Sequence, residues 1–205
     1  MNYFEGLEFF LFLSIILCVG FIINFLEKKK ELYILLISLI LAGLVYGQSK
    51  KMVAYLVVFI VYQYLLVRMA HRLDKKWLKI LTLLSVVPLV INKFFAITSF
   101  HLMAFIGISY MSFKTIQIML EISDGIIKEE YNIWDYLQFL LFFPTVSSGP
   151  IDRSRRFFDD IKTIMPRREY LELAGTGIYR IVLGLLYKVM FSTYVYQMLS
   201  ALKNT

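Results

Sequence analysis

The feature that most constrains the fold of this chain is a series of long apolar segments. The first, Tyr3 to Leu26, has 24 residues. As a helix it would extend roughly 36 Å, against a hydrocarbon core of roughly 30 Å. Hydrophobic residues make up 59% of the sequence and charged residues only 18%, whereas about a quarter of the residues in soluble domains are charged. These values exclude an ordinary soluble domain and predict an integral membrane protein.

Further apolar segments follow along the chain. They cover residues 32–46, 52–67, 78–91, 100–120, 136–146 and 178–199. The segment 136–146 would reach only about 16 Å as a helix, so we expect it to enter and leave the membrane on one face. The sequence therefore predicts an all-α, polytopic membrane protein with about six membrane-spanning helices plus one re-entrant segment. We expect residues 1–205 to form a single membrane domain.

The distribution of Lys and Arg predicts the orientation. If the N-terminus lies outside, fifteen of these cations fall in inner loops and three in outer loops. The opposite orientation would invert this bias, against the rule that inner loops are the positive ones. We therefore expect the N-terminus outside.

One helical face in the segment 100–120 and just beyond it carries unusual polarity. Tyr110, Lys114, Gln117 and Glu121 are spaced i, i+4, i+7 and i+11, which places all four on one face. A charged residue within an apolar segment is expected to face the interior of the bundle or a water-filled cavity. The hypothesis is that this face lines a polar path. The alternative is a Lys114 that extends to the membrane surface or pairs with a distant carboxylate.

The stretch from Phe142 to Arg153 is broken by Pro144 and by Gly149-Pro150. Irregular backbone at membrane depth is tolerated only inside protein or beside a cavity, so we expect a re-entrant element next to a substrate path. Ser147 and Ser148 lack the Gly-x-Ser-x-Gly context of a nucleophile and are interpreted as hydrogen-bonding residues. Asp152 is predicted to cap a short helix over 153–161.

Residues 149–177 are predicted to form a cytoplasmic, amphipathic, basic segment. Its cations are interleaved with apolar side chains such as Phe157, Phe158 and Ile161, as in elements that lie on a membrane surface. The segment either anchors the chain to the inner surface or binds an acidic partner. The predicted docking residues are Asp152, Arg153, Arg155 and Arg156.

Several other functions lack support in the residue pattern. No nucleic-acid motif accompanies the net charge of +7, so we expect no nucleic-acid partner. No His, Cys, Asp and Glu residues have the spacing of metal ligands, and no metal is expected. His71 and His101, the two histidines, have no nearby partner that would mark a catalytic pair.

Three motifs resemble the membrane-bound O-acyltransferase family, and in particular its D-alanyl branch in Gram-positive bacteria. They are Gly107-Ile108-Ser109-Tyr110, Asp124-Gly125-Ile126-Ile127-Lys128-Glu129 and Phe143-Pro144 followed by Ser147-Ser148-Gly149-Pro150-Ile151-Asp152-Arg153. The run Leu183-Gly184-Leu185-Leu186-Tyr187-Lys188 fits the same branch. The resemblance covers residues 104–190 well and the rest of the chain loosely.

The resemblance implies an acyl transfer at the bacterial cell membrane. D-alanine, held as a thioester on the phosphopantetheine arm of a small acidic carrier protein, would pass towards teichoic acid outside. No cofactor would bind the chain directly. Membrane lipid and other membrane proteins of the pathway would be further partners. The expected substrate-path residues are Ser109, Tyr110, Lys114, Gln117, Ser148, Gly149 and Pro150.

One element of the family pattern is missing from these 205 residues. The family's catalytic histidine lies in the second half of members about twice this length, and neither His71 nor His101 matches its motif. We therefore expect an N-terminal portion of a larger acyltransferase, with no catalytic residue here and no activity alone. The alternatives are a non-catalytic membrane scaffold, half of a channel or transporter, or an acyltransferase of the same family with a polysaccharide acceptor.

Overall fold

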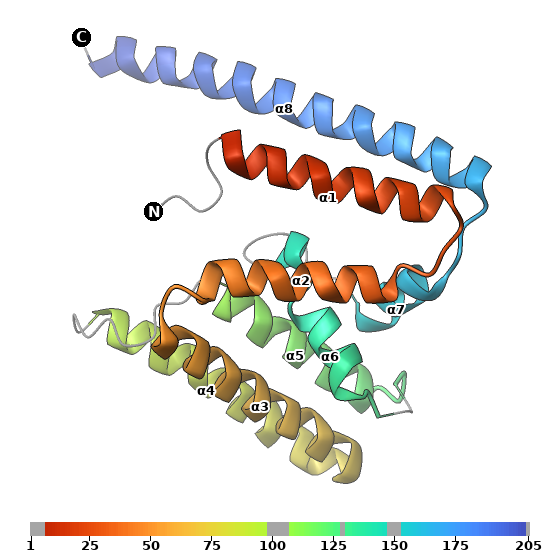
Figure 1. The fold of residues 1–205 in the computed structure, drawn as a ribbon. Coiled ribbons are helices and arrows are strands. Elements are labelled where there is room, and N and C mark those ends of the chain that lie inside the picture. The colour runs from red at the N-terminus through yellow and green to blue at the C-terminus, as the bar shows by residue number, and fades with distance from the viewer. Residues whose placement is uncertain (1–6, 98–106, 128–129, 147–152, 204–205) are drawn as a thin grey trace. The chain divides into compact units, whose positions relative to one another are not determined.

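The structure, a computed structural model, describes residues 7–97, 107–127, 130–146 and 153–203. These residues form helices α1 (Leu7–Phe25), α2 (Glu31–Tyr46), α3 (Lys50–Arg72), α4 (Lys75–Ile97), α5 (Ile108–Ser123), α6 (Ile133–Leu140), α7 (Ser154–Lys162) and α8 (Arg167–Lys203), with a 3-10 turn η1 (Phe143–Thr145) between α6 and α7 (Figure 1). No strand occurs in the described ranges. The predicted all-α class is confirmed.

Three of these helices are long and apolar enough to cross a membrane. They cover Lys50–Arg72, Lys75–Phe94 and Arg167–Ser200, and shorter apolar helices cover Leu11–Phe25 and Glu31–Tyr46. Together with the composition, they place the protein in a membrane. The count of about six spanning helices and the re-entrant segment remain predictions.

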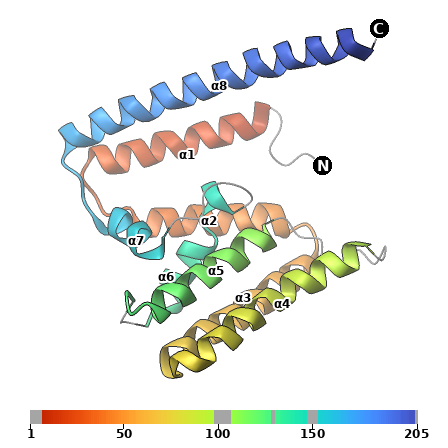
Figure 2. The same cartoon turned by 180° about the vertical axis from the view of Figure 1, so that it is seen from behind.

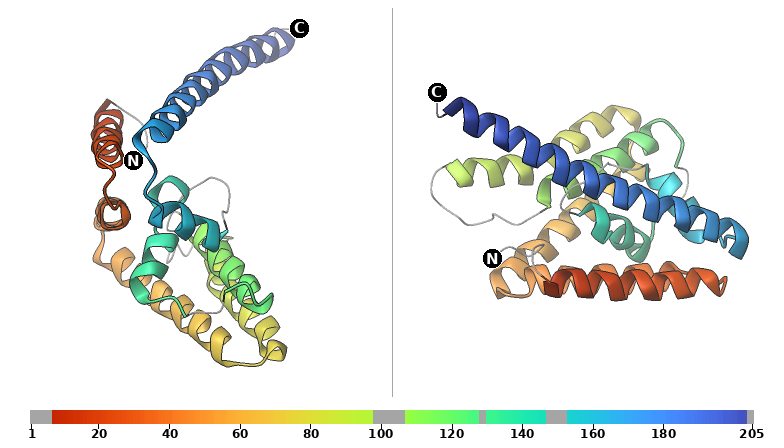
Figure 3. Two further views of the ribbon diagram at one scale, coloured as in Figure 1. Left: turned by 90° about the vertical axis from the view of Figure 1, so that its right-hand side faces the viewer. Right: turned by 90° about the horizontal axis from the view of Figure 1, so that it is seen from above.

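The chain divides into two compact units. The first unit contains residues 1–18 and 30–163, and the second contains residues 19–29 and 164–205. In the first unit, α3 and α4 lie side by side and are joined by a short turn at Leu73-Asp74 (Figures 1 and 2). Helix α5 packs against both, while α2 packs against α6 and η1 (Figure 3). Helix α5 is therefore the element that most of the first unit is built around.

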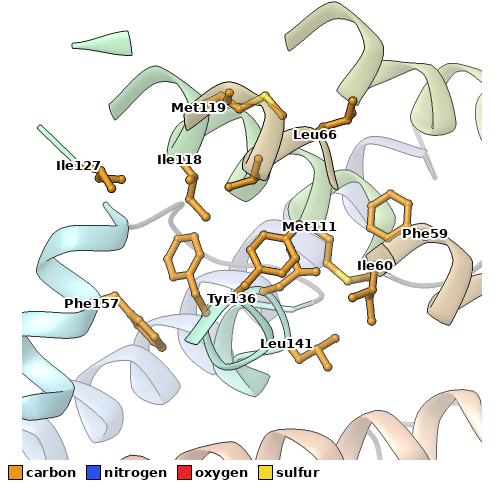
Figure 4. Packing of buried hydrophobic residues seen from close by; sticks show 14 of the residues in the cluster. Phe59, Ile60, Leu66, Met111, Ile118, Met119, Ile127, Tyr136, Leu141 and Phe157 are labelled. Carbon is orange, nitrogen blue, oxygen red and sulfur yellow. The ribbon is translucent and has the colours of Figure 1, made fainter. Parts of the chain in front are cut away.

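Side chains from helices α2 to α7 form the core of the first unit, part of which is shown in Figure 4. Phe59 and Ile60 come from α3, Met111 from α5, Tyr136 from α6 and Phe157 from α7. Met111 and Tyr136 are fully buried. Phe139 of α6 also contacts the rings of Phe157 and Phe158 of α7, and because aromatic side chains bury a large area, these contacts hold the two short helices together.

The short apolar segment predicted over 136–146 differs in detail from the structure. Helix α6 begins three residues earlier, at Ile133, and ends at Leu140. Asn132 explains the early start, because its side chain accepts a hydrogen bond of 2.7 Å from the Asp135 amide as an N-cap. Pro144 lies in the first turn of η1, a position that needs no backbone donor.

The second unit contains a much longer helix than the sequence predicts. Helix α8 has 37 residues and extends roughly 55 Å. It begins at Arg167, where the Pro166 carbonyl accepts the first intrahelical bond from Tyr170 at 2.9 Å. It then continues through Gly175 and Gly177, each of which disfavours helix by only about 1 kcal/mol. The predicted basic segment 149–177 therefore contains α7 and the first turns of α8.

Candidate functional site

Lys114 is the charged residue that the sequence places inside an apolar segment. Its side chain is buried, with 2% of the residue exposed. The ammonium group donates hydrogen bonds to the carbonyl oxygens of Phe139 at 2.9 Å and Leu140 at 3.3 Å, and lies 5.4 Å from the centre of the Phe139 ring. Those two carbonyls lie in the last turn of α6, where backbone carbonyls have no N–H donor within the helix. Lys114 therefore caps the C-terminus of α6.

Gln117 and Glu121 contact the beginning of α7. The Gln117 side-chain oxygen accepts a hydrogen bond of 3.1 Å from the Ser154 amide, the first residue of α7. The Ser154 hydroxyl donates to a Glu121 carboxylate oxygen. Because that hydroxyl has one proton, the Tyr131 hydroxyl, 3.2 Å away, must donate to it. One backbone amide at the N-terminus of α7 is therefore satisfied by a side chain of α5, and the Ser154 side chain adds a second contact to the same helix.

We define the polar face of α5 as Tyr110, Lys114, Gln117 and Glu121. Its charges are complementary to the dipoles of two other helices, α6 and α7. A cation lies at the negative C-terminus of α6, and a carboxylate and an amide oxygen lie at the positive N-terminus of α7. Both helices are too short to be stable alone. The polar face of α5 therefore determines where α6 ends and where α7 begins.

The motifs that begin at Gly107 and at Phe143 meet in the structure. Gly107 occupies the N-cap of α5 with φ of 89°, a conformation that favours glycine. A Cβ atom at this position would overlap the Val146 carbonyl oxygen. The backbone of the first motif therefore packs directly on the backbone of the second, which no side chain larger than hydrogen would allow.

Helix α7 confirms the predicted amphipathic character of its segment. Phe157, Phe158 and Ile161 are buried, whereas Arg155 and Arg156 remain 71% and 74% exposed. Asp152, the predicted cap of this helix, lies outside the described residues. In the structure Arg153 occupies the cap position and the helix begins at Ser154, and the Ser154 amide finds its acceptor on α5.

The predicted docking arginines face solvent beside their own counter-charges. Arg155 lies 3.9 Å from Asp159, and Arg156 lies 3.8 Å from Asp160, each one turn along the helix. Exposed pairs of this kind contribute only about 0.3–0.5 kcal/mol. Breaking either pair to form an ion pair with another protein would therefore cost little free energy.

The other predicted site residues have the following positions. Ser109 and Tyr110 are half-buried in the first turn of α5. Arg153 is exposed. Ser148, Gly149, Pro150 and Asp152 lie outside the described residues, as does His101. The substrate-path and docking roles remain predictions.

Sequence reasoning missed an interaction between the loop after α5 and the end of α3. Glu130 contacts Arg68 at 3.1 Å and Arg72 at 3.4 Å. The hydrogen bond from Arg68, together with the charges of both arginines, holds the pKa of Glu130 below its ordinary value. The neighbouring Tyr131 reaches Ser154, and burial raises the pKa of its hydroxyl. No residue spacing signals this link, because its members are 58 and 62 positions apart.

The fold and the site define a helical membrane protein in which a buried polar helix face joins two short helices. No family model matches the chain. Three teichoic acid D-alanyltransferases are similar to it, each at 34% identity: those of Bacillus subtilis (strain 168), over 92% of this chain, and of Streptococcus thermophilus and Lacticaseibacillus rhamnosus, over 90%. The chain covers 51%, 46% and 48% of these proteins, about half the length of each. The predicted resemblance to D-alanyl transfer proteins is confirmed.

Proposed function

We propose that this chain is part of a membrane acyltransferase of the membrane-bound O-acyltransferase family. It would pass D-alanine from a carrier-protein thioester towards teichoic acid in the cell envelope. The observation that carries this proposal is the 34% identity over 92% of the chain to a teichoic acid D-alanyltransferase. The donor would be the phosphopantetheine arm of an acidic carrier protein.

The charge arrangement of α7 supports the part of the proposal that concerns the carrier. The first turn of α7 contains no acid of its own, and Arg153, Arg155 and Arg156 lie at this end although a helix favours anions there. Local helix stability therefore does not account for Arg153, Arg155 and Arg156. An acidic carrier would replace two weak pairs within the helix by pairs between the two proteins, and its negative field would speed the encounter.

The polar face of α5 supports the part that concerns the substrate path. Ionisable residues inside a membrane segment are costly and therefore suggest a functional role. Lys114 and Glu121 position α6 and α7, and Ser109 and Tyr110 are only half-buried at the start of the same helix. In this proposal Ser109, Tyr110 and Gln117 line the acyl path beside the helix ends.

The proposal places the acid–base chemistry outside residues 1–205. Neither His71 nor His101 matches the family's histidine motif. We propose that the chain alone does not transfer D-alanine and that its N-terminus lies outside the cell. Turnover of D-alanyl carrier by purified 1–205 would contradict the first statement.

A deletion experiment tests the function. The coding region is removed from the bacterium that carries it, and D-alanine esters on teichoic acid are quantified after mild alkaline release. The proposal predicts that the esters fall and return when the wild-type region is restored. An unchanged ester content in the deletion strain would overturn the proposal.

A binding experiment tests carrier docking. We expect the Arg155→Glu/Arg156→Glu variant to bind D-alanyl carrier more slowly than wild type in detergent, with a difference that shrinks at high salt, because exposed charges are screened over about 8 Å at physiological ionic strength. The matched control is Lys50→Glu/Lys51→Glu, which reverses two charges at the start of α3. Equal association rates for wild type and the arginine variant at low salt would remove the docking role.

A further inference from the structure

The joined ends of α3 and α4 must lie at a membrane surface. Both helices are candidate spans, and α3 ends at Arg72 only three positions before α4 begins at Lys75. A helix of about 20 residues matches the hydrocarbon thickness, so the turn between two such helices lies among lipid headgroups. We call residues 72–80 the hairpin end; it lies where α3 ends and α4 begins, opposite the start of α3 (Figure 1).

The hairpin end carries cations that the protein does not neutralise. Lys75, Lys76 and Lys79 are exposed, and none of them makes an ion pair with any described residue. Arg72 differs, because it shares Glu130 with Arg68. Asp74 is the one carboxylate in the hairpin end. The excess positive charge is therefore concentrated on the three lysines.

Helix stability does not account for these lysines. The first turn of α4 contains no acidic residue, and Asp74, directly before it, is a single carboxylate against three lysines, although the N-terminus of a helix is its positive end and favours anions. Lys75 and Lys76 therefore lie where the helix dipole opposes them. An external anion would relieve this repulsion.

Apolar side chains at the same place distinguish a lipid surface from an acidic protein. Trp77 is 53% exposed, and Leu73 and Ile80 are 37% and 48% exposed. Tryptophan is enriched where hydrocarbon meets headgroups, because its ring is apolar and its N–H is polar. Lysines extend from such a position towards the headgroups. An acidic soluble protein would match the charge of the lysines but not the exposed apolar side chains, whereas a lipid surface matches both.

We infer that the hairpin end is a binding surface for anionic phospholipid, in which Lys75, Lys76 and Lys79 attract the headgroup and Trp77 inserts at the interface. The inference is independent of the proposed function. Each lysine near an anionic surface raises lipid affinity roughly fivefold. Anionic lipid should therefore be enriched around Trp77 relative to zwitterionic lipid.

Quenching of Trp77 fluorescence by brominated lipid tests this inference. The sequence has two tryptophans, so Trp134→Phe in every variant leaves Trp77 as the reporter. The protein is placed in phosphatidylcholine nanodiscs that contain the same minor fraction of either brominated phosphatidylglycerol or brominated phosphatidylcholine. We expect several-fold stronger quenching by the anionic lipid, reduced at high salt and reduced in Lys75→Gln/Lys76→Gln.

The matched control is Lys50→Gln/Lys51→Gln, which removes two lysines from the N-terminus of α3 at the other end of the helix pair. It changes the net charge equally and should leave the anionic preference at Trp77 unchanged. Two results would overturn the inference. One is equal quenching by the two brominated lipids in the protein with native lysines, and the other is an equal loss of preference in the two double variants.

Discussion

In two regions of the molecule, side chains form hydrogen bonds to unpaired backbone groups at helix ends, one region being buried and the other exposed. In the first unit, the buried Lys114 donates to the carbonyls at the end of α6, and the half-buried Gln117 accepts from the Ser154 amide at the start of α7. In the second unit, Arg167 donates to the Phe25 carbonyl at the end of α1 (3.0 Å), while the Glu27 carboxylate accepts from the Arg167 amide at the start of α8 (2.8 Å). We call this second arrangement the α1–α8 junction. In both regions, side chains complete helix ends that lack their own partners.

The difference between the regions is exposure to water. At the α1–α8 junction, Arg167 and Glu27 are exposed, so water can replace any hydrogen bond that is lost. On the polar face of α5, carbonyls that lose Lys114 stay buried without a donor, which costs about 1–3 kcal/mol for each group. Similar contacts should therefore contribute more to stability in the first unit than in the second.

The largest effect is expected for Lys114→Met, which keeps the volume and removes the donor. The Phe139 and Leu140 carbonyls lose a shared partner, so we expect a loss of about 2–3 kcal/mol and a fall in Tm of roughly 4–10 °C in detergent. Lys93→Met, at an exposed lysine of α4, is the control and should stay within about 0.5 kcal/mol of wild type. Equal effects of the two substitutions would show that burial does not decide the cost of losing a lysine.

A double-mutant cycle measures the buried contact at α7. The substitutions Glu121→Ala and Ser154→Ala should show a coupling energy of about 1.5–3 kcal/mol, as for a buried hydrogen bond to a charged group. The comparison cycle is Arg156→Ala with Asp160→Ala, an exposed pair on the same helix, with an expected coupling of about 0.3–0.5 kcal/mol. Similar coupling energies would contradict the role of burial.

The α1–α8 junction should show a smaller effect with an unusual ranking. Glu27 has φ of 53°, a conformation that disfavours residues other than glycine by about 1 kcal/mol. Glutamate occupies this position nevertheless, and its carboxylate accepts a hydrogen bond at the N-terminus of α8. We expect Glu27→Ala to lower stability by about 0.5–1 kcal/mol, and Glu27→Gly to be more stable than Glu27→Ala by a similar amount. The measurement is Tm at low and high salt; a cost of Glu27→Ala that does not shrink in salt would argue against a charge effect.

The smallest effect concerns Glu130 and depends on pH. Arg68 holds the pKa of Glu130 below its ordinary value, so the folded state binds fewer protons there than the unfolded state. This contribution is present above the unfolded pKa of about 4.3 and is lost as pH falls through the lower folded pKa. The Tm difference between wild type and Glu130→Gln should therefore shrink when pH is lowered from 7 into that range. A Tm difference that grows on acidification would contradict a lowered pKa of Glu130 in the folded state.

The sequence predicted several local features well. Apolar runs located the long helices in the described residues, although α8 extends well beyond its predicted segment, because helices form through contacts three and four residues apart. The spacing of Lys114, Gln117 and Glu121 correctly placed them on one face of a helix. The amphipathic pattern of Phe157, Phe158 and Ile161 likewise identified the buried side of α7.

Tertiary structure decided what these features contact. Lys114 binds carbonyls 25 and 26 residues away, and the cap of α7 lies 37 residues upstream at Gln117. Residue spacing determines which side chains share a helix face, since that geometry repeats every 3.6 residues. It does not determine which helix ends meet that face, because every helix end offers the same unpaired carbonyls and amides and only tertiary packing brings a particular end close. That is why the sequence alone predicted a polar face on α5, whereas only the folded chain shows that this face completes α6 and α7.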